Sequence, residues 1–198
     1  MVSLRSLTTF LLSLTPTVLA VTPSTVVNNL EALKNKSIDL QVPAREVNLI
    51  NAQLFVLGRG PIPGLITQYN TFIDFVDGLN AAYQGSPPFA AGDAIAATIP
   101  NAFRGFTREH SILLNILIGN ARLAGFVPGV GVLPPLNTAM GTVLSKARAA
   151  LETYTARVVA LTDAAADSQI EGSGAEINGT YTVTYNYYQN GLLTDILG

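Results

Sequence analysis

The sequence predicts an all-α protein, an antiparallel bundle of about five helices. Apolar residues recur at spacings of three and four along most of the chain, as they do on the buried face of a helix. Clusters of glycine and proline separate these stretches. The 198 residues include no cysteine, so packing of the core would have to hold the fold together without disulfides. The part of the chain after residue 171 does not share the helical pattern.

Residues 1–20 have the pattern of a cleavable signal peptide. A positive charge at Arg5 precedes a short apolar run at 10–14, and small residues precede a cut after Ala20. This order of features is typical of secretory signals, and the run is too short to span a bilayer. A buried N-terminal helix is the alternative, but the stretch has no polar face. We therefore predict a secreted protein that begins near Val21.

Three helices are predicted in the first half of the mature chain. They cover residues 24–36, residues 44–57 after Pro43, and residues 65–83. The third has the clearest amphipathic pattern, because seven apolar residues fall on one face. These residues are Leu65, Tyr69, Phe72, Ile73, Val76, Leu79 and Tyr83.

The next two predicted helical regions are longer. Residues 93–126 are helical with a break, where Asp93 can cap a short helix and Pro100 either interrupts or opens the following one. Residues 112–118 are apolar almost all round, which indicates either a central helix or one that lines a ligand cavity. Residues 136–168 give the longest regular pattern and are predicted as one helix. A bundle domain would therefore cover residues 21–171.

The C-terminal part, residues 172–198, differs in kind. Asn178-Gly179 and Asn190-Gly191 are turn signals, and aromatic or β-branched residues alternate with polar ones between them. Alternation of this kind is typical of a strand. A short hairpin, a strand-like wrap and a loose tail all remain open. The alternating residues are Tyr181, Val183, Tyr185 and Tyr187.

The composition is poor in charge. Only 12% of residues are charged and 48% are apolar, against roughly a quarter charged in ordinary soluble domains. Without residues 1–20 the chain carries 10 basic and 13 acidic side chains, with no basic stripe, which argues against a nucleic-acid partner. No later segment is long enough for a transmembrane anchor. The low charge fits either a protein that works beside apolar material or a tight alanine- and glycine-rich helical core.

Residues suited to catalysis or metal binding are few. The one histidine, His110, stands between Glu109 and Ser111, but neighbours along a helix do not face each other. We expect His110 to be a half-exposed polar residue. There is no Gly-x-Ser-x-Gly motif for a serine nucleophile, and a zinc site lacks ligands. The sequence therefore predicts a non-enzyme with no metal and no cofactor.

Two N-glycosylation acceptors are present, at Asn35 and Asn178. Each is a short triplet that occurs often by chance, but in a secreted chain both would mark surface positions. We expect a glycoprotein if at least one is used.

The order of these features resembles the fungal hydrophobic surface-binding protein A family, which includes cell-wall mannoproteins. The likeness covers roughly residues 22–168. After the signal peptide come the sequence Val26-Val27-Asn28-Asn29-Leu30-Glu31-Ala32-Leu33, a connector through Asp39-Leu40, and Ile50-Asn51-Ala52-Gln53. The resemblance implies a secreted helical bundle in the wall or medium that adsorbs to hydrophobic surfaces, sometimes recruiting an extracellular esterase. It also implies that some relatives hold fatty acids in the bundle core, and it supplies no catalytic residues.

Three functions follow for this chain. The first is binding to hydrophobic surfaces at or outside the fungal cell wall, with an extracellular esterase as a possible partner. The second is a fatty-acid or lipid carrier with an apolar cavity between the third, fourth and fifth helices. The third is a structural wall glycoprotein that contacts cell-wall polysaccharide. The candidate lining residues of a cavity, which would otherwise be ordinary core, are Phe72, Phe75, Leu113 and Leu117.

Overall fold

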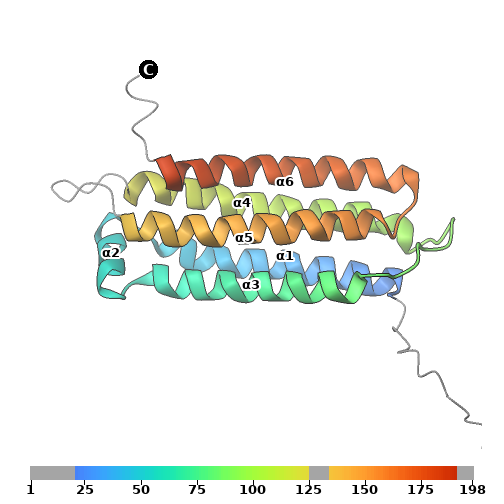
Figure 1. Ribbon diagram of the computed structural model, residues 1–198, viewed down its shortest axis with the longest axis horizontal. Coiled ribbons are helices and arrows are strands. Elements are labelled where there is room, and N and C mark those ends of the chain that lie inside the picture. Colours follow the sequence, from blue (N-terminus) through green and yellow to red (C-terminus); the bar gives the residue numbers. More distant parts are fainter. Residues whose placement is uncertain (1–20, 125–133, 191–198) are drawn as a thin grey trace, which may run out of the picture.

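The computed structural model describes residues 21–124 and 134–190, and these ranges form a helical bundle (Figure 1). The long helices are α1 (Pro23–Glu46), α3 (Pro61–Tyr83), α4 (Ile99–Ala124), α5 (Pro134–Val159) and α6 (Ala164–Asn190). The short elements are α2 (Leu49–Ala52), η1 (Gln53–Leu57) and η2 (Ala96–Thr98). No strand occurs in the ranges described, so the predicted all-α class is confirmed. The signal peptide predicted at residues 1–20 lies outside these ranges.

The five long helices form a closed ring. In the order α1, α4, α6, α5 and α3, each packs against the next, and α3 packs against α1 again. Helices that follow one another in the sequence run in opposite directions (Figure 1). One end of the ring is crossed by α2 and η1, which contact α3, α4 and α5; we call it the α2 end. Because all five helices turn a face inward, they share one core.

Helix α1 is longer than the sequence predicted. Thr22 caps its N-terminus by accepting a hydrogen bond from the Thr25 amide at 3.2 Å. The helix then continues through Asp39-Leu40, predicted as a connector, and past Pro43 to Glu46. Ser37 and Leu40 keep the spacing of the buried face, so burial of that face outweighs the polar residues and the proline.

The predicted helix over residues 44–57 is wrong. The chain instead turns at Val47, and Asn48 Oδ1 accepts hydrogen bonds from the amides of residues 50 and 51 to start α2. Gly58 adopts the left-handed conformation that ends η1. The apolar residues of this stretch do not share a buried face, since Ile50 is 83% exposed and Leu57 is 69% exposed.

Helices α3 and α4 follow the sequence closely. All seven residues predicted on the inner face of residues 65–83 are buried. The break in residues 93–126 is where Asp93 Oδ1 accepts hydrogen bonds from the amides of Ile95 and Ala96. Pro100 falls in the first turn of α4, where its missing N–H costs nothing.

The single helix predicted over residues 136–168 is two helices. Helix α5 ends at Val159, and Asp163 caps α6 by accepting from the amides of Ala165 and Ala166 at 3.1 and 3.0 Å. An aspartate cap satisfies the free amides at a helix start. The chain therefore reverses direction between α5 and α6, although the apolar spacing continues across the turn.

The prediction of a strand-like or loose tail is also wrong as far as residue 190. Helix α6 crosses the predicted boundary at residue 172 without a break. Thr180, Thr182 and Thr184 donate hydrogen bonds to the carbonyls four residues earlier, which satisfies their hydroxyls within the helix. The buried residues recur at helical spacing and face α4 and α5. They are Ala166, Ile170, Gly174, Ile177, Tyr181, Thr184 and Tyr188.

Candidate functional site

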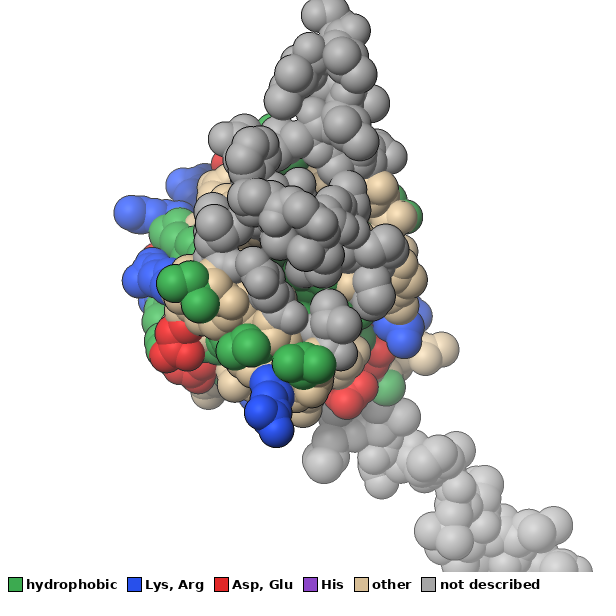
Figure 2. Space-filling view, turned by 90° about the vertical axis from the view of Figure 1, so that its left-hand side faces the viewer, with side chains coloured by type: hydrophobic (Ala, Val, Ile, Leu, Met, Phe, Trp, Pro, Cys, Tyr) green, Lys and Arg blue, Asp and Glu red, His purple; other side chains and the backbone are tan. Residues whose placement is uncertain are grey.

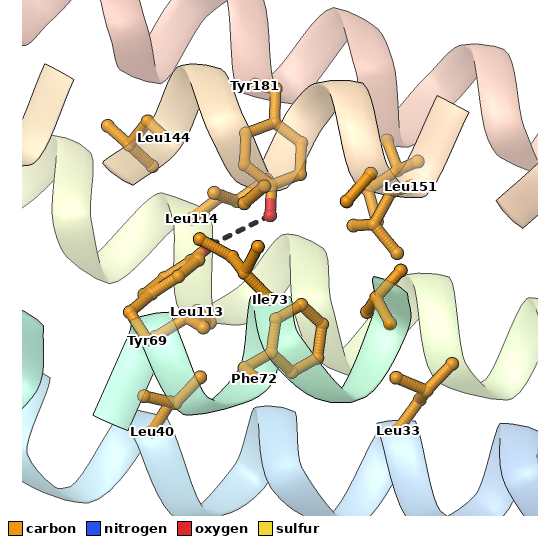
Figure 3. Close-up of a cluster of buried hydrophobic side chains, with 14 of the residues drawn as sticks. Leu33, Leu40, Tyr69, Phe72, Ile73, Leu113, Leu114, Leu144, Leu151 and Tyr181 are labelled. Atoms are coloured by element: carbon orange, nitrogen blue, oxygen red, sulfur yellow. Dashed lines mark hydrogen bonds between the residues drawn. The ribbon is translucent and has the colours of Figure 1, made fainter. Parts of the chain in front are cut away.

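The centre of the five-helix ring is filled by aromatic side chains. Helix α3 supplies two, α4 two, and α5 and α6 one each, and all are less than 2% exposed. Figure 3 shows Phe72 and Tyr69 from α3 beneath Tyr181 from α6, with leucines of the surrounding helices around them. These six residues are Tyr69, Phe72, Phe103, Phe106, Tyr154 and Tyr181.

A chain of buried hydrogen bonds runs through this apolar centre. The Tyr69 and Tyr181 hydroxyls are 2.8 Å apart (dashed in Figure 3), and Tyr181 lies 2.5 Å from His110 Nε2. His110 Nδ1 lies 2.8 Å from Ser37 Oγ, which donates to the Leu33 carbonyl at 2.8 Å. We call the side chains Tyr69, Tyr181, His110 and Ser37 the polar chain. Its members come from α3, α6, α4 and α1.

The Leu33 carbonyl fixes the tautomer of His110 through Ser37. The Ser37 hydroxyl hydrogen is used by the Leu33 carbonyl, so His110 must donate from Nδ1 to Ser37 Oγ. Nε2 is then the acceptor, and two hydroxyls lie within reach of it, Tyr181 at 2.5 Å and Tyr69 at 3.1 Å. The shorter distance favours Tyr181 as the donor to Nε2, with Tyr181 Oη accepting from Tyr69. Every donor hydrogen of the polar chain is used. The only hydrogen-bonding positions left unused are acceptor lone pairs on the hydroxyl oxygens.

His110 differs from the sequence prediction, because it is fully buried rather than half-exposed. Burial away from water lowers the pKa of its imidazole from 6.5 to about 3. Phe72 stacks on the ring with centroids 4.9 Å apart, and Phe106 lies at 5.7 Å. A neutral imidazole with both nitrogens occupied is a structural group, with no free position for acid–base chemistry.

The polar chain is the feature that sequence reasoning missed. Ser37 and His110 occupy positions at helical spacing from apolar core residues such as Leu33 and Leu113. A polar residue within an otherwise apolar stripe was the available signal. It predicts burial with a hydrogen-bond partner, whereas the identity of that partner depends on helices far away in sequence.

The candidate lining residues separate into two groups. Phe72, Leu113 and Leu117 are buried in the common core. Phe75 lies at its edge, partly buried, with the Lys36 ammonium 4.9 Å from the ring centroid. A cation above an aromatic face is a favourable contact at the α1–α3 edge. The structure therefore brings three of the four together.

A small cavity lies at the α2 end. Its volume of about 10 Å³ is room for one water molecule. A wider groove of about 390 Å³ opens on the surface between α5 and α6. The small cavity touches all five long helices or their ends, and it is lined by Val47, Ile62, Leu65, Asn120, Leu136, Met140 and Tyr188.

The two predicted glycosylation positions differ in exposure. Asn35 is exposed on α1. Asn178 is half-buried on α6, and its Oδ1 atom is buried without a hydrogen-bond partner among the described residues. A glycan is therefore accommodated more readily at Asn35.

The described ranges contain neither a metal-binding cluster nor a membrane-spanning helix. No group of three or more histidine, aspartate or glutamate side chains there is placed to hold a metal ion. None of the helices in residues 21–124 and 134–190 combines the length and apolar character needed to cross a membrane.

Three solved structures share this architecture. AFMP4P in complex with palmitic acid matches with a TM-score of 0.66 and 11% identity, over 85% of this chain and all of that one. Ligand binding domain 1 of Penicillium marneffei MP1 protein, complexed with arachidonic acids, matches at 0.65 and 13% identity, over 85% and 99%. This chain has their fold.

The third match is weaker. Ligand binding domain 2 of the same MP1 protein, complexed with multiple arachidonic acids, matches at 0.52 and 12% identity, over 84% of this chain and 93% of that one. No known family profile matches the chain, and no curated protein matches its sequence. Identities this low establish a related fold and not membership of a family. All three structures are of ligand-binding proteins, which is consistent with the prediction of a non-enzyme.

Proposed function

We propose that this protein binds long-chain fatty acids in the core of its helical ring. The observation that carries the proposal is the fold shared over 84–85% of the chain with three structures that hold palmitic or arachidonic acid. The ring supports it, because five helices surround an apolar centre. This is the carrier function that the sequence offered as its alternative, and it takes precedence over binding to apolar surfaces.

The acyl chain would enter the core from the α2 end. The small cavity there lies between helix ends, and Met140 in its wall is a flexible side chain that can make room. Leu117 and Tyr188 meet in the same region, where the Tyr188 hydroxyl donates to the Leu117 carbonyl at 3.1 Å. An acyl chain would take the place of core side chains that now fill the centre, so binding requires them to move.

The carboxylate would stay near solvent at the α2 end. All donors of the polar chain are used internally, so a carboxylate beside Tyr69 or His110 would find no hydrogen to accept. A buried charge without a partner is strongly unfavourable. The acyl tail would therefore point inward and the head group outward.

The test is a titration with palmitic and arachidonic acid, followed by native mass spectrometry and by calorimetry. We expect saturable binding that weakens in Leu117→Trp, because the larger side chain occupies core volume. Phe75→Ala is the matched control, since Phe75 lies at the edge under Lys36, and it should bind like the wild type. An unliganded mass alone at saturating fatty acid would refute the carrier function.

Adsorption to apolar surfaces is the second candidate. It is favoured by the exposed side chains of Val42, Ile50 and Leu57, and by the resemblance to the hydrophobic surface-binding protein A family. Depletion from solution by hydrophobic beads, well beyond that of a helical control of matched size, would support it. Recruitment of an esterase or of wall polysaccharide would be tested on the same beads.

We also propose that the protein is secreted after its signal peptide is cleaved. A cut after Ala20 would leave Thr22, the cap of α1, in the mature chain. N-terminal sequencing of the protein from the culture medium of a fungal host should begin at Val21. A start at Met1 with retention in the cell would contradict it.

A further inference from the structure

The exposed apolar side chains are concentrated in one stretch of the chain. Seven large hydrophobic residues are exposed in the part that the structure describes, and five of them fall between residues 38 and 57. The remaining two, Ile95 and Val183, lie in separate places. We call the five side chains the apolar end; they are Ile38, Val42, Ile50, Leu54 and Leu57.

Ile38 and Val42 lie on the long helix α1, whereas the backbone under Ile50, Leu54 and Leu57 is built from short elements. Helix α2 has four residues and η1 has five, so neither is stable without packing. Ala52 is buried and Phe55 packs against the core, which anchors the segment. Ile50, Leu54 and Leu57 point away from that anchor and meet solvent. This apolar exposure contributes nothing to the folding of the isolated chain.

The charges around this segment have a consistent arrangement. Residues 47–58 include no charged side chain, and Arg45 and Arg59 bracket them, with Glu46 the one acid. Both arginines are exposed. Figure 2 looks onto this end of the bundle, where hydrophobic side chains lie beside both basic (blue) and acidic (red) side chains. Apolar side chains flanked by cations suit the boundary between phospholipid head groups and acyl chains.

The segment also packs against the end of the ring by which a fatty acid would enter. Val47 and Ile62 adjoin α2 and η1 in the sequence and line the small cavity at the α2 end. Helix α2 contacts α3 and α4, and η1 contacts α3 and α5. Displacing α2 and η1 would expose the helix ends around that cavity.

We propose that the segment formed by α2 and η1 docks on the surface of a phospholipid bilayer and admits the fatty acid to the core. The admission of the fatty acid rests on the proposed carrier function, whereas the docking on the bilayer does not. Ile50, Leu54 and Leu57 insert at the level of the upper acyl chains. Arg45 and Arg59 contact lipid phosphates. A fatty acid can then pass from the bilayer into the ring without crossing water.

The first experiment measures partition to vesicles of phosphatidylcholine and phosphatidylglycerol (3:1) by co-sedimentation. We expect Ile50→Ser/Leu57→Ser to bind at least about tenfold more weakly than the wild type, because two exposed apolar side chains are lost. The matched control is Ile95→Ser/Val183→Ser, which removes two exposed apolar side chains elsewhere. Its partition should change less than about twofold, and equal loss in both variants would overturn the docking site.

The second experiment separates the charges from the apolar side chains. Arg45→Gln/Arg59→Gln should lower partition to the anionic vesicles at least about fivefold, and much less to pure phosphatidylcholine. The loss should shrink at high salt, since screening already weakens those contacts. The proposal would be overturned if the wild type bound neither vesicle type. It would also be overturned if the wild type formed a dimer through this face without lipid.

The third experiment distinguishes docking from carriage. Transfer of a fluorescent fatty acid from vesicles to protein should slow at least about fivefold in Ile50→Ser/Leu57→Ser, while its affinity for palmitic acid in solution stays that of the wild type. If the wild type binds no fatty acid, the carrier function fails, and vesicle partition still tests the docking. Unchanged transfer with unchanged affinity would show that the fatty acid enters elsewhere.

Discussion

At the scale of single residues, the polar chain ties together four of the five long helices. Each link lies between helices that are distant in sequence, such as Ser37 with His110 at 2.8 Å. Breaking such a chain lowers the free energy of unfolding, because a buried polar group without a partner has lost its hydrogen bonds to water without replacing them. We infer that it fixes the relative heights of these helices, since a shift of one turn would separate all the partners.

The bond directions predict unequal effects of two conservative changes. Ser37→Ala removes the acceptor of the His110 Nδ1 hydrogen and should cost about 1–3 kcal/mol of unfolding free energy. Tyr69→Phe removes only the terminal donor, because Tyr181 can still donate to Nε2, and should cost about 1 kcal/mol. Urea unfolding of both variants would measure the order. A larger loss in Tyr69→Phe would contradict this assignment of donors and point to Tyr69, 3.1 Å from Nε2, as the donor to His110.

The protein should lose stability in mild acid because of His110. Its pKa is about 3 in the fold and 6.5 in the unfolded chain, so the unfolded chain binds more protons between these values and stability falls as pH drops below about 6.5. Between pH 7 and pH 5 the loss should be about 2 kcal/mol. Because the chain has one histidine, His110→Gln should flatten this part of the urea-unfolding profile. A wild-type profile flat to pH 5 would contradict the burial.

At the scale of elements, α6 shows how contacts override local preference. Residues 172–190 contain glycines, threonines and tyrosines, which are weak helix formers. Their buried face packs on α4 and α5, and Gly174 allows α6 to approach Thr155 closely. A Cβ at Gly174 would lie 2.6 Å from Thr155 Cγ2. The helix therefore depends on a glycine that would weaken it in isolation.

Two glycines of α6 provide a matched test. Gly172→Ala meets no atom within 4 Å and should raise the unfolding free energy by about 0.5–1 kcal/mol through helix propensity. Gly174→Ala gains the same propensity but collides with the stiff Thr155 side chain, so its net effect should be a loss of about 1 kcal/mol or more. Thermal and urea unfolding would give both values. Equal stabilisation by both changes would show that α5 and α6 are farther apart.

At the scale of the whole molecule, the closed ring couples ligand binding to folding stability. A fatty acid inside the core binds the folded chain and not the unfolded one. At one hundred times its dissociation constant it should add about 2.7 kcal/mol, which raises Tm by roughly 5–10 °C for a chain of this size. Scanning calorimetry with palmitic acid would measure the shift. A ligand held only on an outer surface of the fold should leave Leu117→Trp with the same shift as the wild type.

The sequence by itself determined the helical class, the inner face of α3, the capped break at Asp93 and the apolar composition of the core. These features depend on spacing and on neighbours a few residues away, so they can be read locally. Only the tertiary structure decided the turn at residues 160–163, the helical state of residues 172–190 and the partners of His110. Each of these depends on contacts between helices far apart in the chain. Tyr181 belongs to a strand-like pattern when read alone, and becomes part of a helix because α4 and α5 bury one side of it.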